Sequence, residues 1–319
     1  MPASFTHGFA FDPSYDYSLD ELLNVGAPLA PTDFREFWQA RYARALQVHP
    51  CPRIRHTGTS HAGFEVYSLR YFSTDHVVIR GWVLIPQDQP VTRGMVFGHG
   101  YGGCDGPDYR LCPKGAALLF PCFRGLARSQ HPPISTNPAF HVLHDIDKPQ
   151  QYIIGGCVDD VWLAVSSMQM LFPATQGHIG YSGVSFGGWI GALALPWEPR
   201  IQRAHLNVPT FGNQPLRLQL PTIGSGAAVQ RYQQQHGNVL ATLQYYDAAS
   251  AATFIRQPMH VAAALFDPAV APPGQFAIYN ALSGKKSLFT LDAGHFAYPQ
   301  QAAQEQALQG ELEAFFSRL

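Results

Sequence analysis

The residues with the most specific chemical spacing form the pentapeptide Gly183-Val184-Ser185-Phe186-Gly187, a GxSxG pattern. An apolar run at residues 178–181 precedes it, and a stretch of small residues at 188–195 follows it. A serine in a tight strand-to-helix turn is exposed as a nucleophile, and flanking glycines avoid clashes with neighbouring backbone. A structural turn alone can carry the same pattern, so it is the strand–turn–helix context that favours Ser185 as a nucleophile.

A serine hydroxyl is a weak nucleophile at neutral pH and needs an imidazole base that a carboxylate orients. Among 14 histidines, His295 stands out because it directly follows the predicted strand at residues 287–291 and precedes a long helical stretch at 300–319. From this position a histidine can reach the serine of a nucleophile turn. We therefore predict His295 as the base.

Two carboxylates compete for the orienting role. Asp267 ends the apolar run 260–266, so it is predicted at the carboxyl end of a strand, on the same sheet edge as Ser185. Asp292 is only three residues before His295 and is expected to stabilise its own loop. We predict Asp267 as the acid, since the order serine, acid, histidine is the one found in the α/β-hydrolase fold.

Hydrolysis through Ser185 would create an oxyanion that needs about two aligned N–H donors. One is expected from the backbone of Phe186, the residue after the nucleophile. The other is expected from the loop after an earlier strand, which reads Gly98-His99-Gly100-Tyr101-Gly102-Gly103. A glycine-rich strand connection is weak evidence by itself, and the GxSxG context gives it weight.

The elements that must position these residues alternate along the chain. Apolar runs predict strands, and between them lie stretches with helical spacing, including residues 158–171. This alternation predicts a single α/β-hydrolase domain over 1–319, with a mostly parallel sheet and helices on both faces. Residues 1–90 are predicted to add an N-terminal helix after Thr32-Asp33 and a hairpin. Residues 212–250 are predicted to form a helical insertion beside the active site. The predicted strands are residues 64–72, 77–85, 95–97, 116–120, 178–181, 205–208, 259–266 and 287–291.

Composition limits the partners and the compartment. The formal net charge is −1 and no Lys/Arg run occurs, so no nucleic-acid or anionic-membrane partner is expected. No segment reaches the roughly 18 apolar residues of a membrane span. The five cysteines are odd in number and lack a CxxC pair, so we expect free thiols, no metal site and a cytoplasmic protein.

The chain resembles the acetyl xylan esterase/cephalosporin C deacetylase family, carbohydrate esterase family 7, over nearly its whole length. No single piece of this resemblance is specific, whereas the combination is. The matching pieces are His99-Gly100-Tyr101, Phe123-Arg124-Gly125, residues 183–188, Asp267 with Pro272-Pro273, residues 276–280, Gly294-His295, the Pro28–Trp38 region and residues 81–86.

The resemblance implies hydrolysis of acetyl esters of sugars or similar alcohols, no cofactor, and a homo-oligomer, commonly a ring-like hexamer with inward-facing sites. It also implies that Ser185, Asp267 and His295 form the triad and that the backbone amides of Tyr101 and Phe186 form the oxyanion hole.

This sequence departs from the family pattern at four positions near the predicted site. The family commonly has glutamine at the positions of Leu126 and Phe186, glycine at that of Val184, and glutamate at that of Phe296. The triad and backbone donors survive these changes, so they bear on substrate preference.

Two interpretations of acyl preference remain open. Bulk from Tyr101, Phe186, Pro209 and Phe211 would leave a small acyl pocket suited to acetyl or propionyl. Leu126, Phe186 and Phe296 could instead create a wider apolar pocket for butyryl or longer chains. Acyl transfer or peptide cleavage on the same triad, and a non-catalytic binding role, are alternative functions.

Overall fold

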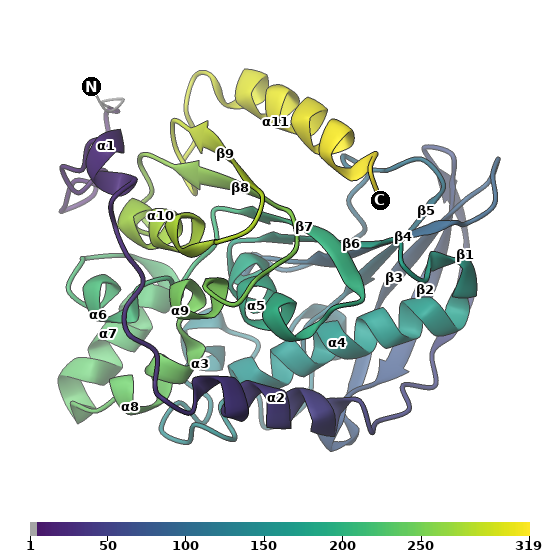
Figure 1. The fold of residues 1–319 in the computed structure, drawn as a ribbon, viewed down its shortest axis with the longest axis horizontal. Coiled ribbons are helices and arrows are strands. Elements are labelled where there is room, and N and C mark those ends of the chain that lie inside the picture. The colour runs from purple at the N-terminus through teal and green to yellow at the C-terminus, as the bar shows by residue number, and fades with distance from the viewer. Residues whose placement is uncertain (1–4) are drawn as a thin grey trace.

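The computed structural model describes residues 5–319. Over these residues a nine-stranded sheet runs in the order β1-β2-β3-β5-β4-β6-β7-β8-β9 (Figure 1). The strands are β1 (Arg53–His61), β2 (Phe64–Phe72), β3 (Val78–Pro86), β4 (Arg93–Gly98), β5 (Ala116–Pro121), β6 (Ile179–Val184), β7 (Ile201–Asn207), β8 (Met259–Ala264) and β9 (Lys286–Leu291).

Six of these strands form the predicted parallel part of the sheet. β5, β4, β6, β7, β8 and β9 pair in parallel in that order, and β6 lies between β4 and β7. The carboxyl ends of β6, β8 and β9 therefore meet at one edge, where the predicted nucleophile, acid and base follow them. The predicted α/β architecture is confirmed.

An antiparallel extension precedes the parallel strands. β2 and β3 form the predicted hairpin, in register from Phe64 opposite Pro86 to Phe72 opposite Val78. β1 pairs with β2 at the sheet edge and was not predicted, because most of its side chains are polar and exposed and leave no apolar alternation to detect.

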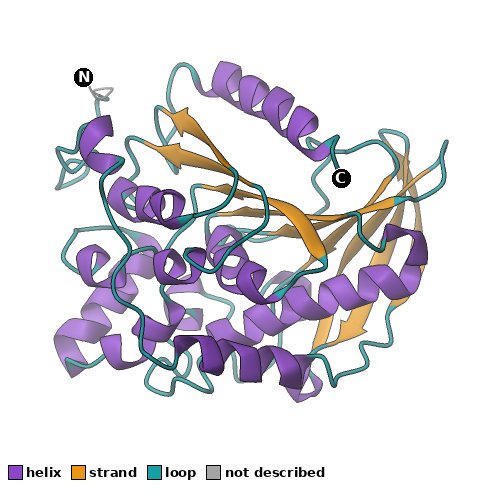
Figure 2. Cartoon of the chain, viewed as in Figure 1, coloured by secondary structure: helices purple, strands orange, loops and turns teal. Residues whose placement is uncertain are grey.

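Helices cover the sheet unequally (Figure 2). α4, α5 and α10 pack against one face, with α2 outside α4, while α11 lies across the opposite face. The helices are α1 (Leu19–Leu22), α2 (Phe34–Ala45), α3 (Pro138–His141), α4 (Ile153–Leu171), α5 (Phe186–Ala194), α6 (Gln214–Arg217), α7 (Gly224–His236), α8 (Leu240–Leu243), α9 (Ala248–Ala252), α10 (Pro272–Ala281) and α11 (Gln301–Phe316).

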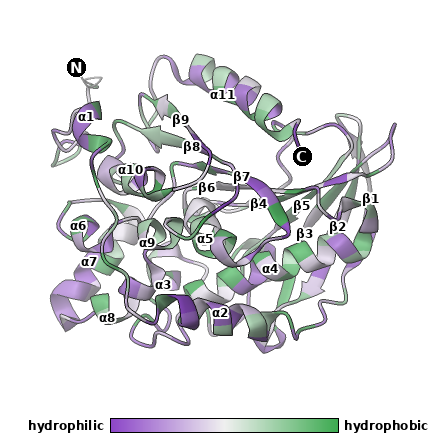
Figure 3. Cartoon of the chain, in the orientation of Figure 1, coloured by the Kyte–Doolittle hydropathy of each residue, from purple (hydrophilic) through white to green (hydrophobic). Residues whose placement is uncertain are grey.

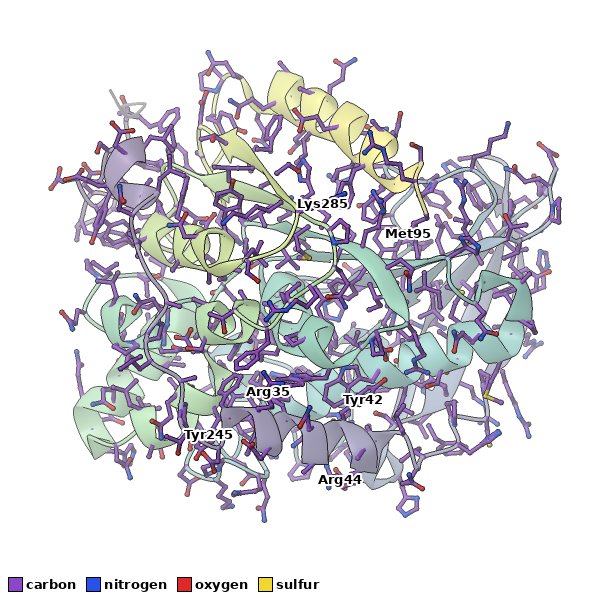
Figure 4. The ribbon with its side chains drawn as sticks, viewed as in Figure 1. Arg35, Tyr42, Arg44, Met95, Tyr245 and Lys285 are labelled. Carbon is purple, nitrogen blue, oxygen red and sulfur yellow. The ribbon has the colours of Figure 1, made fainter. Side chains whose placement is uncertain are left out.

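The core has two main parts, one on each face of the sheet. The larger part lies on the α4 side, where α4 and α5 are buried along nearly their whole length and colour mostly apolar in Figure 3. The smaller part lies beneath α11, where Leu308, Leu312 and Phe316 meet Met95 from β4. Met95 lies on this face of the sheet in Figure 4.

The predicted N-terminal helix is α2, which begins at Phe34, directly after Thr32-Asp33. The carboxylate of Asp33 makes no capping bond and instead accepts a hydrogen bond from Tyr245 Oη at 2.8 Å. Tyr245 lies in the turn after α8, close to α2 in Figure 4. The hydrogen bond therefore ties the N-terminal helix to the insertion.

Residues 212–250 are largely helical, as predicted, and contain α6, α7, α8 and the start of α9. The insertion contacts the loop that carries Asp267, because Thr222 Oγ1 donates to the carbonyls of Pro268 and Ala269 at 3.1 and 2.9 Å. Its position beside the predicted site is thus fixed by hydrogen bonds to that loop.

Candidate active site

Ser185 lies between the end of β6 and the start of α5, with φ 52° and ψ −109°. This backbone conformation is rare for a residue with a side chain, and such strain is concentrated at functional sites. A Cβ at Gly183 would come closer than 3.0 Å to the carbonyl of Gly187, and one at Gly187 would come equally close to that of Gly98. The two glycines of the motif therefore allow β6, α5 and the end of β4 to meet at Ser185.

The structure brings the three predicted side chains into one hydrogen-bonded chain. His295 Nε2 is 2.9 Å from Ser185 Oγ, and His295 Nδ1 is 2.8 Å from Asp267 Oδ2. Asp292 is not part of this chain; its backbone N–H donates to Gln304 Oε1 at 3.0 Å. The choice of Asp267 over Asp292 as the partner of His295 agrees with this geometry.

Asp267 is fully buried and held by donors on both oxygens. Oδ1 accepts from the backbone N–H groups of Ala269 and Val270, both at 2.9 Å. Oδ2 accepts from His295 and from Gln275 Nε2 at 3.0 Å. A carboxylate with this many donors keeps one orientation.

Gln275 is a positioning residue that the sequence analysis missed. It is fully buried in α10, and its Oε1 accepts from the N–H of Ala264 on β8 at 2.8 Å. Its Nε2 donates to Asp267 and to the carbonyl of Val270. The available signal was a glutamine within an apolar helix, two residues after Pro273.

The pKa of His295 is set by two opposing effects. Burial lowers it, but the charge of Asp267 and the hydrogen bond to it have the larger combined effect, so the pKa is raised above 6.5. His295 must be neutral to accept a proton from Ser185. The Ser185–His295 pair is therefore in its reactive state above this raised pKa and loses that state as the pH falls through it.

The backbone amides of Tyr101 and Phe186 are placed to serve as oxyanion donors. Phe186 is the first residue of α5, so its N–H has no partner within the helix. Within residues 5–319 neither amide donates to another protein group. A Cβ at Gly100 would lie 3.6 Å from Ser185 Cβ, which places the Tyr101 loop against Ser185.

Two buried histidines hold this loop, and neither was singled out for this role from the sequence. His99 Nε2 accepts from the N–H of Phe123 at 3.0 Å, so its Nδ1–H donates to the carbonyl of Gly100 at 2.8 Å. His141 Nε2–H donates to the carbonyl of Arg124 at 2.9 Å, so its Nδ1 accepts from Tyr101 Oη at 3.0 Å.

Both histidines must be neutral to make these bonds, and burial lowers the pKa of each to about 4. They therefore link the loop after β4 to the segment after β5 throughout the neutral pH range.

The predicted lining residues mostly lie elsewhere. Phe186 is completely buried, and its ring stacks on that of Tyr101 with centroids 4.0 Å apart. Phe211 is also buried, stacked on Trp189 at 4.0 Å, and Pro209 packs against Gly188. The side chains of Phe186 and Phe211 are thus packed in the core, and neither ring forms an exposed pocket surface.

The other three positions that depart from the family pattern also differ in how far their side chains are buried. Leu126 is buried in the core on the α4 side, while Val184 is 39% exposed. Phe296 packs between Phe266 and Phe9, at centroid distances of 5.0 and 6.1 Å. Phe296 therefore joins the N-terminal segment to the loop of His295.

No group of three or more His, Cys, Asp or Glu within residues 5–319 has an arrangement that could hold a metal ion. Over the same residues, no helix is both long and apolar enough to cross a membrane.

Comparison with known proteins agrees with this fold. The family described as Acetyl xylan esterase (AXE1) matches residues 13–310. An acetyl xylan esterase from Paenibacillus sp. R4 superposes with a TM-score of 0.81 at 21% identity, covering 93% of this chain and 99% of that one. Acetyl xylan esterase 1 from Thermoanaerobacterium sp. JW/SL YS485 gives 0.78 at 19% identity, with the same coverage.

A more distant structure shares the fold over part of its length. The acylaminoacyl peptidase of Pyrococcus horikoshii has a TM-score of 0.59 at 15% identity and covers 80% of this chain and 41% of that one. The family match extends over most of this chain and supports a hydrolase that acts on acetyl esters. The chain belongs to the acetyl xylan esterase family.

Proposed function

We propose that this protein is a serine carboxylesterase that hydrolyses acetyl and other short acyl esters of sugars or similar alcohols through an acyl-enzyme intermediate. The observation that carries the proposal is the chain Ser185 Oγ···Nε2 His295 Nδ1···Oδ2 Asp267, with distances of 2.9 and 2.8 Å. This hydrogen-bonded chain begins at Ser185, which lies in a strained turn beside the backbone amides of Tyr101 and Phe186, and neither amide has a partner within residues 5–319.

In the first half-reaction, His295 Nε2 takes the hydroxyl proton as Ser185 Oγ attacks the ester carbonyl carbon. The carbonyl π electrons move to its oxygen, and the resulting oxyanion accepts hydrogen bonds from the amides of Tyr101 and Phe186. His295 then gives its proton to the leaving alcohol oxygen as the C–O bond breaks. The acyl group remains on Ser185, and the free alcohol departs.

Water completes the cycle by the same route in reverse. His295 Nε2 removes a proton from the water as its oxygen attacks the acyl carbon, and the oxyanion returns to the same two amides. Collapse breaks the bond to Ser185 Oγ, which recovers its proton from His295. Asp267 holds Nδ1–H throughout and stabilises the imidazolium, so the base keeps its orientation in both half-reactions.

A serine substitution and an acyl trap test this mechanism together. Ser185→Ala should lose at least about 10³-fold in kcat towards p-nitrophenyl acetate, because the nucleophile is absent. Ser317→Ala, at the exposed end of α11, is the matched control and should keep wild-type activity. Acid-quenched wild type should carry one acetyl group on the peptide containing Ser185.

Two outcomes would overturn the proposal. One is a folded Ser185→Ala protein with a tenth or more of the wild-type activity. The other is acetylation at a different residue in protein that turns over the ester.

A further inference from the structure

A cavity of about 580 Å³ lies between α11 and the sheet, outside the catalytic triad. Residues 99–115, which connect β4 to β5, contain no helix, so α11 provides the helical cover on this face. Phe97 and Phe120 form an apolar wall with stacked rings 4.6 Å apart, and Leu308 and Leu312 of α11 face the cavity. Its size is within the usual range of small-molecule sites.

One wall of the cavity is polar because of two residues on β7. His205 and Asn207 both line it, since residues two apart on a strand share a face. His205 is only 2% exposed. Its Nδ1 lies 3.1 Å from Nδ1 of His260 on β8, and His260 Nε2 lies 3.1 Å from Glu311 Oε2 on α11.

These contacts determine which nitrogens carry protons. The carboxylate of Glu311 accepts, so His260 donates from Nε2–H and keeps a lone pair on Nδ1. His205 must then donate from its own Nδ1–H, which leaves a lone pair on its Nε2. Burial, together with the smaller effect of nearby His260, lowers the pKa of His205 to about 3, so the ring stays neutral.

The neutral ring and its neighbour present unfilled hydrogen-bonding positions to the cavity. Within residues 5–319, His205 Nε2 has no hydrogen-bond partner, and the buried Oδ1 of Asn207 has none either. The buried amide oxygen of Asn207 carries a desolvation penalty while it has no partner, and a hydroxyl bound to this side chain would remove that penalty.

We propose that this cavity is a second ligand site, which binds a neutral sugar or polyol through His205 Nε2 and the side-chain amide of Asn207. A hydroxyl both donates and accepts, so it can satisfy the imidazole lone pair and either end of the amide. The rest of the polar lining consists of the neutral Ser182, Gln306 and Gln309 and the charged Asp105, Asp108, Arg110 and Glu305. Carboxylates accept from hydroxyls and the guanidinium donates to them, so these side chains offer a polyol further partners. The stacked Phe97 wall suits the apolar face of a sugar ring.

The site lies next to the catalytic centre and is separate from it. Gly100 and Val184, which flank Ser185 in space and in sequence, line the cavity, whereas Ser185 and His295 do not. The carbonyl of Asn207 also accepts from the N–H of Ser185 at 2.8 Å. A sugar held on Asn207 would therefore contact the strand end that supports the nucleophile, without occupying the position of the ester.

Binding of non-ester sugars tests the site independently of catalysis. Saturation-transfer NMR with D-xylose, D-glucose and sorbitol should show binding to wild type at millimolar concentrations. Gln309→Trp, which fills the cavity from α11, should weaken binding by about tenfold or more. Ala307→Trp, on an exposed position of the same helix outside the cavity, is the matched control and should bind as wild type.

A second variant and a blocked enzyme complete the experiment. His205→Phe keeps a ring but removes the acceptor, and should weaken binding while His205→Gln partly restores it. Wild type whose Ser185 carries an organophosphate should still bind the sugars, which separates this site from the proposed esterase centre. Binding that is lost on blocking Ser185, or unchanged in Gln309→Trp, would overturn the proposal, as would preferential binding of n-butylammonium.

Discussion

Gly294→Ala is the substitution for which the structure gives the sharpest expectation. Gly294 precedes His295, and a Cβ added to it would come closer than 3.0 Å to Asp267 Oδ2, a separation that real Cβ atoms essentially never show. It would also meet Val208 Cγ1 at 3.0 Å and Ala264 Cβ at 3.1 Å. One methyl group would therefore press directly on the carboxylate that orients the base.

Neither side of this contact can retreat without disturbing the triad. Asp267 is held through Oδ1 by two backbone N–H groups, and the N–H of Gly294 is bonded to the carbonyl of Phe266 at 2.8 Å. To clear the methyl, Oδ2 has to move by more than half an ångström. A movement of that size away from His295 would stretch the Nδ1–Oδ2 distance, now 2.8 Å, beyond the roughly 3.2 Å limit of a good hydrogen bond.

The size of the kinetic effect follows from this displacement. A misplacement of about 1 Å in a catalytic constellation costs up to about 10²-fold, whereas loss of the orienting carboxylate costs about 10⁴-fold. We expect kcat/KM to fall by about 10- to 10²-fold, which corresponds to about 1.4 to 2.7 kcal/mol of transition-state stabilisation. The loss should fall on kcat rather than KM, because the binding surface is unchanged.

The assay is steady-state hydrolysis of p-nitrophenyl acetate, with thermal unfolding to show that the variant is folded. Gly310→Ala is the matched control, because a Cβ there meets nothing within 4 Å and should leave activity unchanged. A folded Gly294→Ala enzyme with wild-type kcat/KM would refute the reasoning, since it would mean that the carboxylate can move without consequence.

Three further outcomes are expected. Gln275→Leu leaves the N–H of Ala264 and one carboxylate lone pair of Asp267 without partners, so kcat should fall by about tenfold and stability by about 1–3 kcal/mol, measured by kinetics and denaturant unfolding. The acidic limb of the kcat/KM profile in wild type should titrate above pH 6.5. In Asp267→Asn its midpoint should shift to lower pH, because burial still lowers the pKa of His295 and the carboxylate that raised it is gone. An unshifted midpoint would contradict this. In an acyl-length series, kcat/KM should peak at acetyl or propionyl esters and fall steeply by octanoyl, and a higher value for octanoyl than for acetyl would refute the small-pocket interpretation.

The triad geometry could be predicted because the sequence motifs of its residues and the topology of the sheet both place those residues at the same sheet edge. A nucleophile turn, a carboxylate at a strand end and a histidine after the last strand each leave a local mark in the sequence. Parallel strands bring those three marks to one edge, so no knowledge of side-chain packing was needed to place Ser185, Asp267 and His295 together.

The residues that support the triad by hydrogen bonds have weaker signatures in the sequence than the triad itself. His99 accepts from the N–H of Phe123 and His141 donates to the carbonyl of Arg124, and a single histidine in the sequence does not reveal which distant backbone group it will meet. Gln275 was missed for the same reason, because the sequence does not show that its side chain bonds both to β8 and to Asp267. β1 was missed because an exposed edge strand has no buried face and therefore no period-two apolar pattern.

Side-chain direction explains why the pocket walls were harder to predict than the triad. At the first position of α5, the N–H of Phe186 is free of the helix while its ring turns into the core and stacks on Tyr101, so one residue serves the site by its backbone and the fold by its side chain. Leu126 is likewise a core residue. The interpretation of a wider apolar pocket used Leu126, Phe186 and Phe296, and the first two are unavailable to it.

The small-pocket interpretation also loses the rings of Phe186 and Phe211 as direct barriers, so acyl selectivity has to come from the backbone that surrounds Ser185. That backbone is held on one side by Gly100 and Tyr101, with His99 and His141 behind them, and on the other by the loop of His295. Backbone fixed by buried hydrogen bonds yields less readily to added methylenes than a flexible side chain does. The predicted preference for short acyl groups would therefore rest on the rigidity of these loops rather than on the bulk of the aromatic residues.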